Sequence, residues 1–351
     1  MPTQRIDFVD ALRALAATAI VFLHVSSPIA QAPVANPGAR WWFANLVYSL
    51  ARPSIALFVM ISGFLLLSPS KEEGIGTFFR KRFIRIVVPF LAWGVVYFVW
   101  KNHAHVSASD CARLVREFVE GPVYYHLWFI YTITGVYLAT PVLRVYVKSA
   151  SLSNYTYLMG TWFAGTCLYP IISHFWGIHI GIPIMTAGGF LGAFLLGDFL
   201  RRVGVGKAAR GWLALIAAVC CTVTVGAGYA LSGGVPVKYD AVFQEFLSPT
   251  VVVTAACIFL LCKDLSLGKM RARFPGAFAA MSAVSGTSFS VYLMHIMVLE
   301  VLKSHIPGFS LDATFVHPAI GIPLTAVVTI FFCVIATLAL RKIPFVKYCL
   351  P

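Results

Sequence analysis

The sequence predicts an all-α protein that crosses a membrane about ten times. Of its 351 residues, 59% are hydrophobic and only 11% are charged, whereas soluble domains carry about 25% charged residues. The mean hydropathy is +0.84, and apolar stretches recur along the whole chain without a long polar linker between them. Most are near the roughly 20-residue length of a membrane-crossing helix, well above the strands of about ten residues in outer-membrane barrels. We therefore expect one transmembrane domain, residues 1–351, and no soluble domain.

The apolar stretches define the expected spans. The first follows Arg5 and resembles a secretory signal, but Asp10 and Arg13 inside it would impair such a signal and suit a helix that faces a bundle interior. The span at 185–200 is short and rich in glycine, so it either packs tightly against a neighbour or is partly re-entrant. In chain order the spans lie near 7–29, 42–68, 84–103, 126–146, 152–171, 185–200, 211–231, 247–262, 282–304 and 317–340.

Lysine and arginine are unevenly distributed between alternate connecting segments. Most of the 27 fall in the segments that are cytoplasmic if the N-terminus is cytoplasmic. The positive-inside rule therefore predicts that both termini face the cytoplasm. This distribution explains most of the net charge of +14 and leaves membrane lipid as the surrounding partner. We expect no nucleic-acid partner, because no polar domain offers a contiguous basic face.

The cysteines and histidines do not have the spacing of a metal or disulfide framework. The eight cysteines lie mostly inside apolar stretches, lack CxxC spacing and put only Cys111 in a loop on the outer side. The histidines are scattered, without a thiol or carboxylate at ligand spacing. We expect no disulfide framework and no metal site.

The first span contains an arginine and a histidine eleven residues apart. At 100° per residue, Arg13 and His24 project from the same helix face, about 16 Å apart along the axis. Asp10 lies three residues before Arg13 and can hold its guanidinium in an ion pair. The alternative is that Arg13 reaches the inner headgroups and His24 only caps the outer end of the span.

The second span carries another buried arginine. Because a charge inside a membrane is costly, Arg52, Arg13 and Asp10 together suggest a polar cavity. Pro53 follows Arg52 directly and would free a backbone carbonyl that such a cavity could use. Ser62 lies later in the same span.

A cluster of cations precedes the third span. Arg80, Arg82 and Arg85 lie within six residues, and Arg82 and Arg85 fall on one face if the helix continues through them. Such a cluster can hold a phosphorylated ligand by charge-assisted hydrogen bonds. Anchoring to lipid headgroups is the alternative.

Two further groups of polar residues occupy the fourth and ninth spans. His126 and Trp128 open the fourth span, where the tryptophan suits a membrane interface and the histidine is less expected. In the ninth span Ser288, Tyr292 and His295 share one helix face. A buried histidine such as His295 is often a packing residue, and that reading stays open beside a chemical one.

The order of these motifs resembles acyltransferase family 3, the bacterial inner-membrane O-acyltransferases. The resemblance covers residues 5 to about 300, and the chain is close in size and layout to the single-domain members that acetylate enterobacterial common antigen and exopolysaccharides. The motifs are Arg13-x10-His24, Arg52-Pro-Ser-Ile-Ala-Leu-Phe-Val-Met-Ile-Ser-Gly-Phe-Leu65, Arg82-x-x-Arg85, Tyr125-His-Leu-Trp-Phe129 and Ser290-Val-Tyr-Leu-Met-His295.

The resemblance implies an enzyme that uses cytoplasmic acetyl-CoA as acyl donor, without a metal. His24 would be the catalytic histidine with Arg13 as its partner, and the acceptor would be a hydroxyl of a glycan or lipid-linked saccharide on the outer side. Acyl-CoA would be bound by Arg13, Arg80, Arg82 and Arg85. We expect supporting roles for Asp10, Arg52, Ser62, His126, Trp128, Tyr292 and His295.

Several alternatives remain open at this stage. His24 could act as a general base, since the ordinary pKa of histidine is about 6.5, or it could carry the acyl group as an acyl-imidazole. The acyl group could be another one, such as succinyl. A transporter or flippase for a phosphorylated or lipid-linked substrate could use the same arginines, although no internal repeat supports it.

Overall fold

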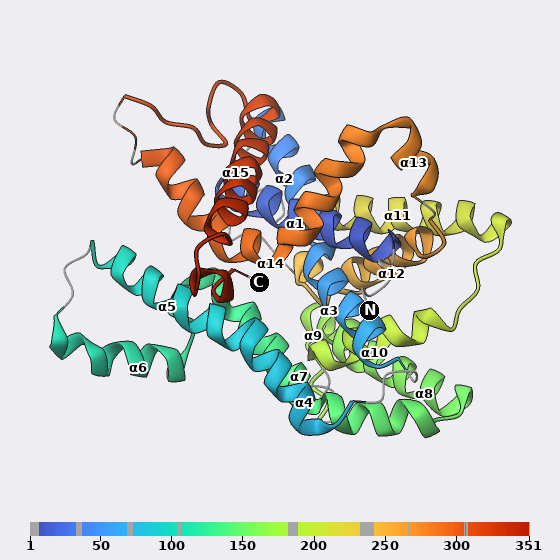
Figure 1. Cartoon of the computed structure of the whole chain (residues 1–351). Coiled ribbons are helices and arrows are strands. Elements are labelled where there is room, and N and C mark those ends of the chain that lie inside the picture. The colour runs from blue at the N-terminus through green and yellow to red at the C-terminus, as the bar shows by residue number, and fades with distance from the viewer. Residues whose placement is uncertain are drawn as a thin grey trace.

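The computed structural model describes residues 7–32, 37–68, 73–103, 107–181, 189–231, 242–265, 267–304, 306 and 308–350. Within these ranges helices joined by short connections make up the fold (Figure 1). The first half contains α1 (Asp7–Ala30), α2 (Ala39–Ala51), α3 (Pro53–Leu66), α4 (Ile75–Arg82), α5 (Val88–Lys101), α6 (Cys111–Glu120), α7 (Trp128–Ser149) and α8 (Leu152–Trp162). The second half contains α9 (Tyr169–Trp176), α10 (Gly189–Arg201), α11 (Lys207–Leu231), α12 (Pro249–Lys263), α13 (Gly268–Arg273), α14 (Pro275–Ser304) and α15 (Pro318–Leu340).

Eight helical segments of the described chain are long and apolar enough to cross a membrane. They correspond to eight of the ten expected spans and identify a multi-pass membrane protein. The expected span at 152–171 is helical as α8, a π-helical turn and α9, but it is not among the eight. Of the span at 185–200, residues 185–188 lie outside the described residues and the remainder belongs to α10. The number ten and the inward orientation of the termini stay predictions.

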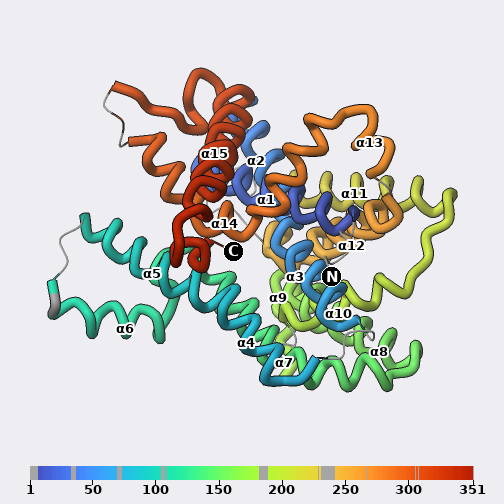
Figure 2. The backbone as a smooth tube through the Cα atoms, in the orientation of Figure 1, coloured from blue at the N-terminus to red at the C-terminus, as the bar shows by residue number. Residues whose placement is uncertain are grey.

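Helix α1 lies at the centre of the bundle and packs against α2, α3, α14 and α15. Figure 1 shows α14 and α15 on one side of it and α11 and α12 on the other. The continuous trace in Figure 2 shows that α5 and α6 extend away from the rest of the bundle. The central place of α1 puts its polar residues within reach of several helices.

Because the long helices run in alternate directions, the bundle has two ends. We call the basic end the one at which α1 and α4 begin and α3 and α7 end, and the other the opposite end. At the basic end, Lys263 Nζ donates hydrogen bonds of 2.6–3.1 Å to three carbonyls that follow α10 or lie at its end. Arg144 Nε donates to the Leu66 carbonyl at 2.8 Å. At the opposite end, the Gln31 amide donates to the Tyr48 hydroxyl at 2.9 Å.

Glycines allow α3 and α10 to make a very close contact. A Cβ atom added at Gly63 would lie 1.7 Å from the Phe194 carbonyl oxygen, and one added at Gly197 would lie 1.9 Å from that of Met60. Only glycine lets two helix backbones approach in this way. The expectation that the glycine-rich span packs tightly against a neighbour is therefore confirmed for the part of the chain that is described.

A proline follows each of two π-helical turns, at Phe83–Val87 and Phe163–Leu168. Pro89 cannot donate to the Arg85 carbonyl four residues before it, and its ring would clash with that carbonyl in a regular α-helix. The wider turn relieves this clash and changes the direction of the side chains within it. The third span was expected at 84–103, but the helix already begins at Ile75, so the arginine cluster lies on a helix and not in a loop.

Pro53 also shapes the helix around it, but not as expected. It has no N–H for the Ser49 carbonyl, and the N–H of Arg52 occupies that carbonyl at 3.2 Å instead. The expectation that Pro53 leaves a free carbonyl for a cavity is therefore wrong, because a tighter turn satisfies the carbonyl within the helix.

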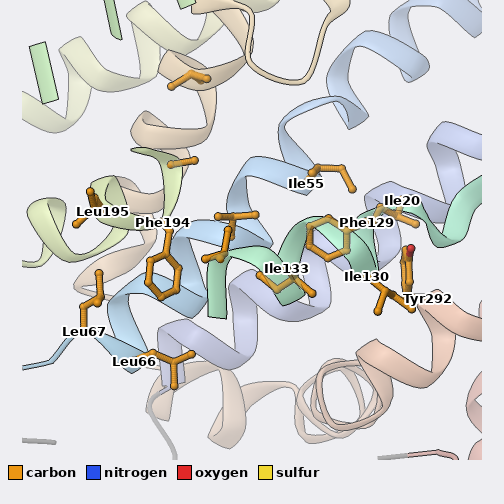
Figure 3. Packing of buried hydrophobic residues seen from close by; sticks show 14 of the residues in the cluster. Ile20, Ile55, Leu66, Leu67, Phe129, Ile130, Ile133, Phe194, Leu195 and Tyr292 are labelled. Carbon is orange, nitrogen blue, oxygen red and sulfur yellow. The ribbon is translucent and has the colours of Figure 1, made fainter. Parts of the chain in front are cut away.

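Buried apolar side chains surround Tyr292, a polar residue of α14. Figure 3 shows Phe129 and Ile130 of α7 near Ile20 of α1 and Ile55 of α3, with Tyr292 of α14 beside Ile130. All five side chains are at most 7% exposed. Tyr292 is thus held in the interior, where α1, α7 and α14 meet.

Candidate functional site

A cavity of about 580 Å³ near the basic end is lined by three arginines. Arg13 comes from α1, Arg82 from the end of α4 and Arg85 from the π-helical turn after it. The cavity is also lined by Ser62 of α3 and by Tyr292 of α14. We call it the basic cavity, and its three cations suit an anionic ligand with several negative groups.

Arg82 is positioned by aromatic rings. Its guanidinium carbon lies 5.2 Å from the centroid of the Phe78 ring and 5.7 Å from that of Tyr137. Its Nε is buried and has no hydrogen-bond partner in the described part of the chain. A buried donor without a partner is costly, so this atom is suited to an anion that enters the cavity.

Asp10 lies close enough to Arg13 to attract its charge, but among the described residues the two side chains do not form the expected direct ion pair. The Asp10 carboxylate accepts a hydrogen bond of 2.8 Å from the Ser285 hydroxyl of α14. The reason is that α14 brings a hydroxyl to the carboxylate, a partner that helical spacing within α1 could not reveal. The Arg13 side chain is left to line the cavity.

Arg52 lies elsewhere, so the two intramembrane arginines do not share one cavity. It is 6% exposed, and its Nε donates to the Gln244 carbonyl while Nη1 donates to the Tyr48 hydroxyl at 3.2 Å. Its guanidinium carbon lies 3.9 Å from the centroid of the Phe246 ring. Arg52 thus joins α2 and α3 to the segment before α12, and it lies close enough to His24 for its charge to act on that ring.

A second, smaller cavity of about 220 Å³ lies near the opposite end. His24 of α1 lines it together with Tyr125, Glu300, Lys303 and Asp312. We call it the outer cavity. Its lining carries both hydrogen-bond donors and acceptors, which suits a hydroxylated ligand.

Three histidines lie between the two cavities. The ring centroid of His295 is 5.0 Å from that of His24 and 5.3 Å from that of His126. His295 Nδ1 lies 2.7 Å from the Tyr292 carbonyl and 3.1 Å from that of Val291. Both are acceptors, so Nδ1 carries the proton and Nε2 holds the lone pair. That Nε2 has no hydrogen-bond partner among the described residues.

Tyr292 connects this layer to the basic cavity. Its ring lies 5.8 Å from that of His126, and its hydroxyl donates to the His126 carbonyl. Because Tyr292 lines the basic cavity and His24 lines the outer one, the two cavities are separated by a thin layer of histidine and tyrosine.

The structure brings together most of the expected site residues. The basic cavity gathers Arg13, Ser62, Arg82, Arg85 and Tyr292. The layer between the basic cavity and the outer cavity gathers His24, His126 and His295.

Besides Asp10 and Arg52, two further expected residues lie outside this arrangement. Arg80 is exposed and does not line the basic cavity. Trp128 lines a separate cavity of about 390 Å³ together with Phe190 and Phe246. Helical direction explains the position of Arg80, which lies two residues before Arg82 and so points to another side of α4.

Sequence reasoning missed Glu300, which lines the outer cavity. Its carboxylate accepts a hydrogen bond of 2.6 Å from Trp100 Nε1 and another from the Tyr124 hydroxyl. The signal was present, because a carboxylate inside an expected span is rare and marks function by default.

The described residues hold no group of three or more histidines, cysteines, aspartates or glutamates with the geometry of a metal site. The absence of a metal requirement stays a prediction.

Comparison with known proteins identifies the family. The model of a family described as an acyltransferase domain, Acyl_transf_3, matches residues 6–338. No curated protein and no solved structure gave a significant match. The family match runs from the beginning of α1 almost to the end of α15 and so includes both cavities and the histidines between them. The chain therefore belongs to acyltransferase family 3 and is a membrane acyltransferase.

Proposed function

We propose that this acyltransferase moves an acetyl group from acetyl-CoA to a hydroxyl of a saccharide on the opposite side of the membrane. The observation that carries the proposal is the position of His24, beside the outer cavity and one layer of side chains from the arginine-lined basic cavity. A donor and an acceptor can thus approach the same region from the two ends.

The basic cavity is the proposed donor site. Coenzyme A carries phosphate groups, which arginines bind by charge-assisted hydrogen bonds. By the positive-inside rule the basic end faces the cytoplasm, where coenzyme A is made. Arg13, Arg82 and Arg85 would hold the phosphates, and the pantetheine arm would extend past Tyr292 toward His24. The membrane in question is the bacterial inner membrane.

His24 is the proposed catalytic residue, in one of two ways. As a general base, it takes the proton of the acceptor hydroxyl while the oxygen attacks the thioester carbon, the C–S bond breaks and the proton passes to the coenzyme A thiolate. As a nucleophile, its ring nitrogen first displaces the thiolate, which takes up the N–H proton of the ring. The acceptor oxygen then displaces the nitrogen, and the freed imidazole takes up the hydroxyl proton. General-base assistance contributes about 10² to 10⁴ in rate.

The test is release of the coenzyme A thiol by purified protein in nanodiscs, with acetyl-CoA as donor and a crude glycan extract as acceptor source. We expect release by the wild type and loss of it in His24→Ala. The matched control is His174→Ala, because His174 is exposed and lines neither cavity. Full release by folded His24→Ala would refute the catalytic role, and donor or lipid movement without thiol release would favour a transporter.

Succinyl-CoA and longer acyl-CoA donors, tested in the same assay, distinguish acetyl transfer from transfer of another acyl group. The proposal expects the highest kcat/KM with acetyl-CoA. A preference of more than about tenfold for another donor, which corresponds to about 1.4 kcal/mol of transition-state binding, would reassign the acyl group.

A further inference from the structure

A cavity outside the proposed acetyl-transfer site opens between α5 and α14. It measures about 770 Å³ and is lined by Val95, Val96 and Val99 of α5 and by Met297 and Glu300 of α14. We call it the lateral groove. The three valines are 37–43% exposed and lie in a membrane-spanning segment. The surface of the groove therefore faces the apolar part of the bilayer, on the side where α5 leans away from the bundle (Figure 2).

The lateral groove meets the outer cavity at Glu300, which lines both. Tyr124 lines the groove, and its ring centroid lies 5.4 Å from that of Tyr125. Tyr125 lines the outer cavity, and its ring centroid lies 5.7 Å from that of His24. An occupant of the groove is thus one layer of side chains from the histidine.

Polar groups line the groove beside the valines. Among them, Lys101 is already paired with the Glu117 carboxylate and the Val123 carbonyl. The Glu300 carboxylate lies at its junction with the outer cavity and is fixed by the Trp100 indole N–H and the Tyr124 hydroxyl. Beyond it, His103 is exposed at the end of the groove, and exposed Lys303 lies one helical turn after Glu300 on the lining of the outer cavity. Neither His103 nor Lys303 forms an ion pair with another described residue. The arrangement offers an apolar wall, an acceptor of hydroxyl protons and donors for an anion.

We propose that the acceptor is an amphipathic lipid with a phosphate-linked headgroup, and that it reaches His24 sideways from the membrane through the lateral groove. This inference rests on the acyl-transfer function proposed above. The chain lies along the valines, the phosphate is bound by Lys303 and His103, and the first hydroxylated group enters the outer cavity.

The sizes of the two cavities support placing the lipid chain in the groove and the hydroxylated group in the outer cavity. The outer cavity, at about 220 Å³, is less than a third of the lateral groove, at about 770 Å³. It accommodates a reacting group but not a lipid chain. The Glu300 carboxylate accepts a hydrogen bond from the headgroup hydroxyls and repels the phosphate, which keeps the phosphate at the outer rim beside Lys303.

The chemistry at His24 is unchanged by this route. The acceptor oxygen forms the new ester bond with the acyl carbon as the thioester C–S bond breaks, and its proton passes through His24 to the coenzyme A thiolate. The groove supplies a high local concentration of acceptor, since the lipid diffuses in two dimensions and is held next to the histidine.

The experiment uses benzophenone-labelled farnesyl phosphate as a probe for the groove, with wild-type protein in nanodiscs. After irradiation, mass spectrometry maps the labelled residues. We expect saturable labelling of the facing segments of α5 and α14. Unlabelled farnesyl phosphate should compete at least about tenfold better than farnesol, because a charge-assisted contact to phosphate is lost in the alcohol.

Two substitutions of exposed valines give a matched comparison. Val99→Trp fills the groove, whereas Val142→Trp places the same ring on α7, where Val142 is 73% exposed and outside the groove. We expect Val99→Trp to abolish the saturable labelling and Val142→Trp to preserve it. Lys303→Gln should remove the preference for the phosphate over the alcohol.

Equal competition by farnesol, or equal labelling of both tryptophan variants, would overturn the proposal and identify the occupant as a bulk membrane lipid. Thiol release from acetyl-CoA is measured on the same samples without a lipid acceptor, as the slow transfer to water. It should persist in Val99→Trp and depend on His24. A normal His24-dependent release without groove labelling would refute only the lipid route, and groove labelling without such release would refute only the acyl-transfer function.

Discussion

The two neighbouring arginines Arg82 and Arg80 should contribute very differently to donor binding. Arg82 lines the basic cavity, is packed against Phe78 and Tyr137, and has a buried Nε without a partner among the described residues. Arg80 is exposed and does not line the cavity. A pair of variants, Arg82→Gln and Arg80→Gln, removes one positive charge each and so keeps the net charge of the two proteins equal.

The magnitude follows from the contact that each side chain can make. A hydrogen bond to a charged group is worth about 1.5–3 kcal/mol, which corresponds to a rise of about 10- to 150-fold in the KM for acetyl-CoA in Arg82→Gln. An exposed charge that makes no contact is worth well under 1 kcal/mol, so Arg80→Gln should change KM by less than about threefold.

The assay is the initial rate of thiol release against acetyl-CoA concentration, at fixed acceptor and with folding verified by size-exclusion chromatography. Raising the salt concentration should weaken the exposed contribution further and the buried one less. Equal effects of the two substitutions, or an unchanged KM in Arg82→Gln, would refute the assignment of the basic cavity as the donor site.

Three other predictions test the fold and the site. Gly63→Ala should destabilise the protein by about 1–3 kcal/mol, because its Cβ would lie 1.7 Å from a carbonyl oxygen of α10. Thermal unfolding in detergent measures this effect. Gly135→Ala is the control and should not destabilise the protein, because a Cβ there meets nothing within 4 Å. The Lys81 ammonium, bonded to Glu73 at 2.5 Å, lowers the pKa of that carboxyl, so the pair should add stability above the unfolded pKa of about 4.3. The difference in melting temperature between wild type and Glu73→Gln should therefore shrink as the pH falls through the lowered folded pKa. A difference that grows there would contradict this. Tyr292→Phe should lower kcat more than it raises the KM for the donor, because the Tyr292 hydroxyl holds the His126 backbone in the layer between the two cavities. An effect on KM alone would contradict that role.

The membrane-spanning character and most of the spans follow from the sequence because they depend on properties averaged over about twenty residues. The beginning of the third span was missed because arginines and a lysine make α4 and the following turn polar, although they continue one helix into α5. The close crossing of α3 and α10 could be expected from glycine content, but Gly63 as the matching position on α3 could not.

The site was predictable where residues lie on one helix. Arg13 and His24 both face α14, since Arg13 shares its cavity with Ser285 and His24 lies beside His295. Contacts between distant segments were not predictable. Asp10 bonds Ser285, 275 residues later in the chain, and no periodicity within one span contains that information.

Arg52 and Glu300 show what an ionisable residue in a span does and does not reveal. Arg52 was expected at a cavity because a buried charge is costly, but a carbonyl 192 residues away and an aromatic ring satisfy it. Glu300 is likewise an ionisable residue in a span; it is half-buried and does line a cavity. The free-energy cost of an ionisable group inside a span shows only that the group needs a partner. The three-dimensional structure shows whether that partner is the protein or a ligand.

In the proposed mechanism, a donor at the basic end and an acceptor at the opposite end meet at His24. The most direct measurement uses sealed proteoliposomes in which the protein has one orientation, with radiolabelled acetyl-CoA on the side of Arg82 and Arg85 only and the saccharide acceptor on the other side only. We predict labelled ester on the acceptor across the intact membrane, dependent on His24 and absent when the two compartments are exchanged. Transfer that occurs only when donor and acceptor are on the same side would contradict this mechanism.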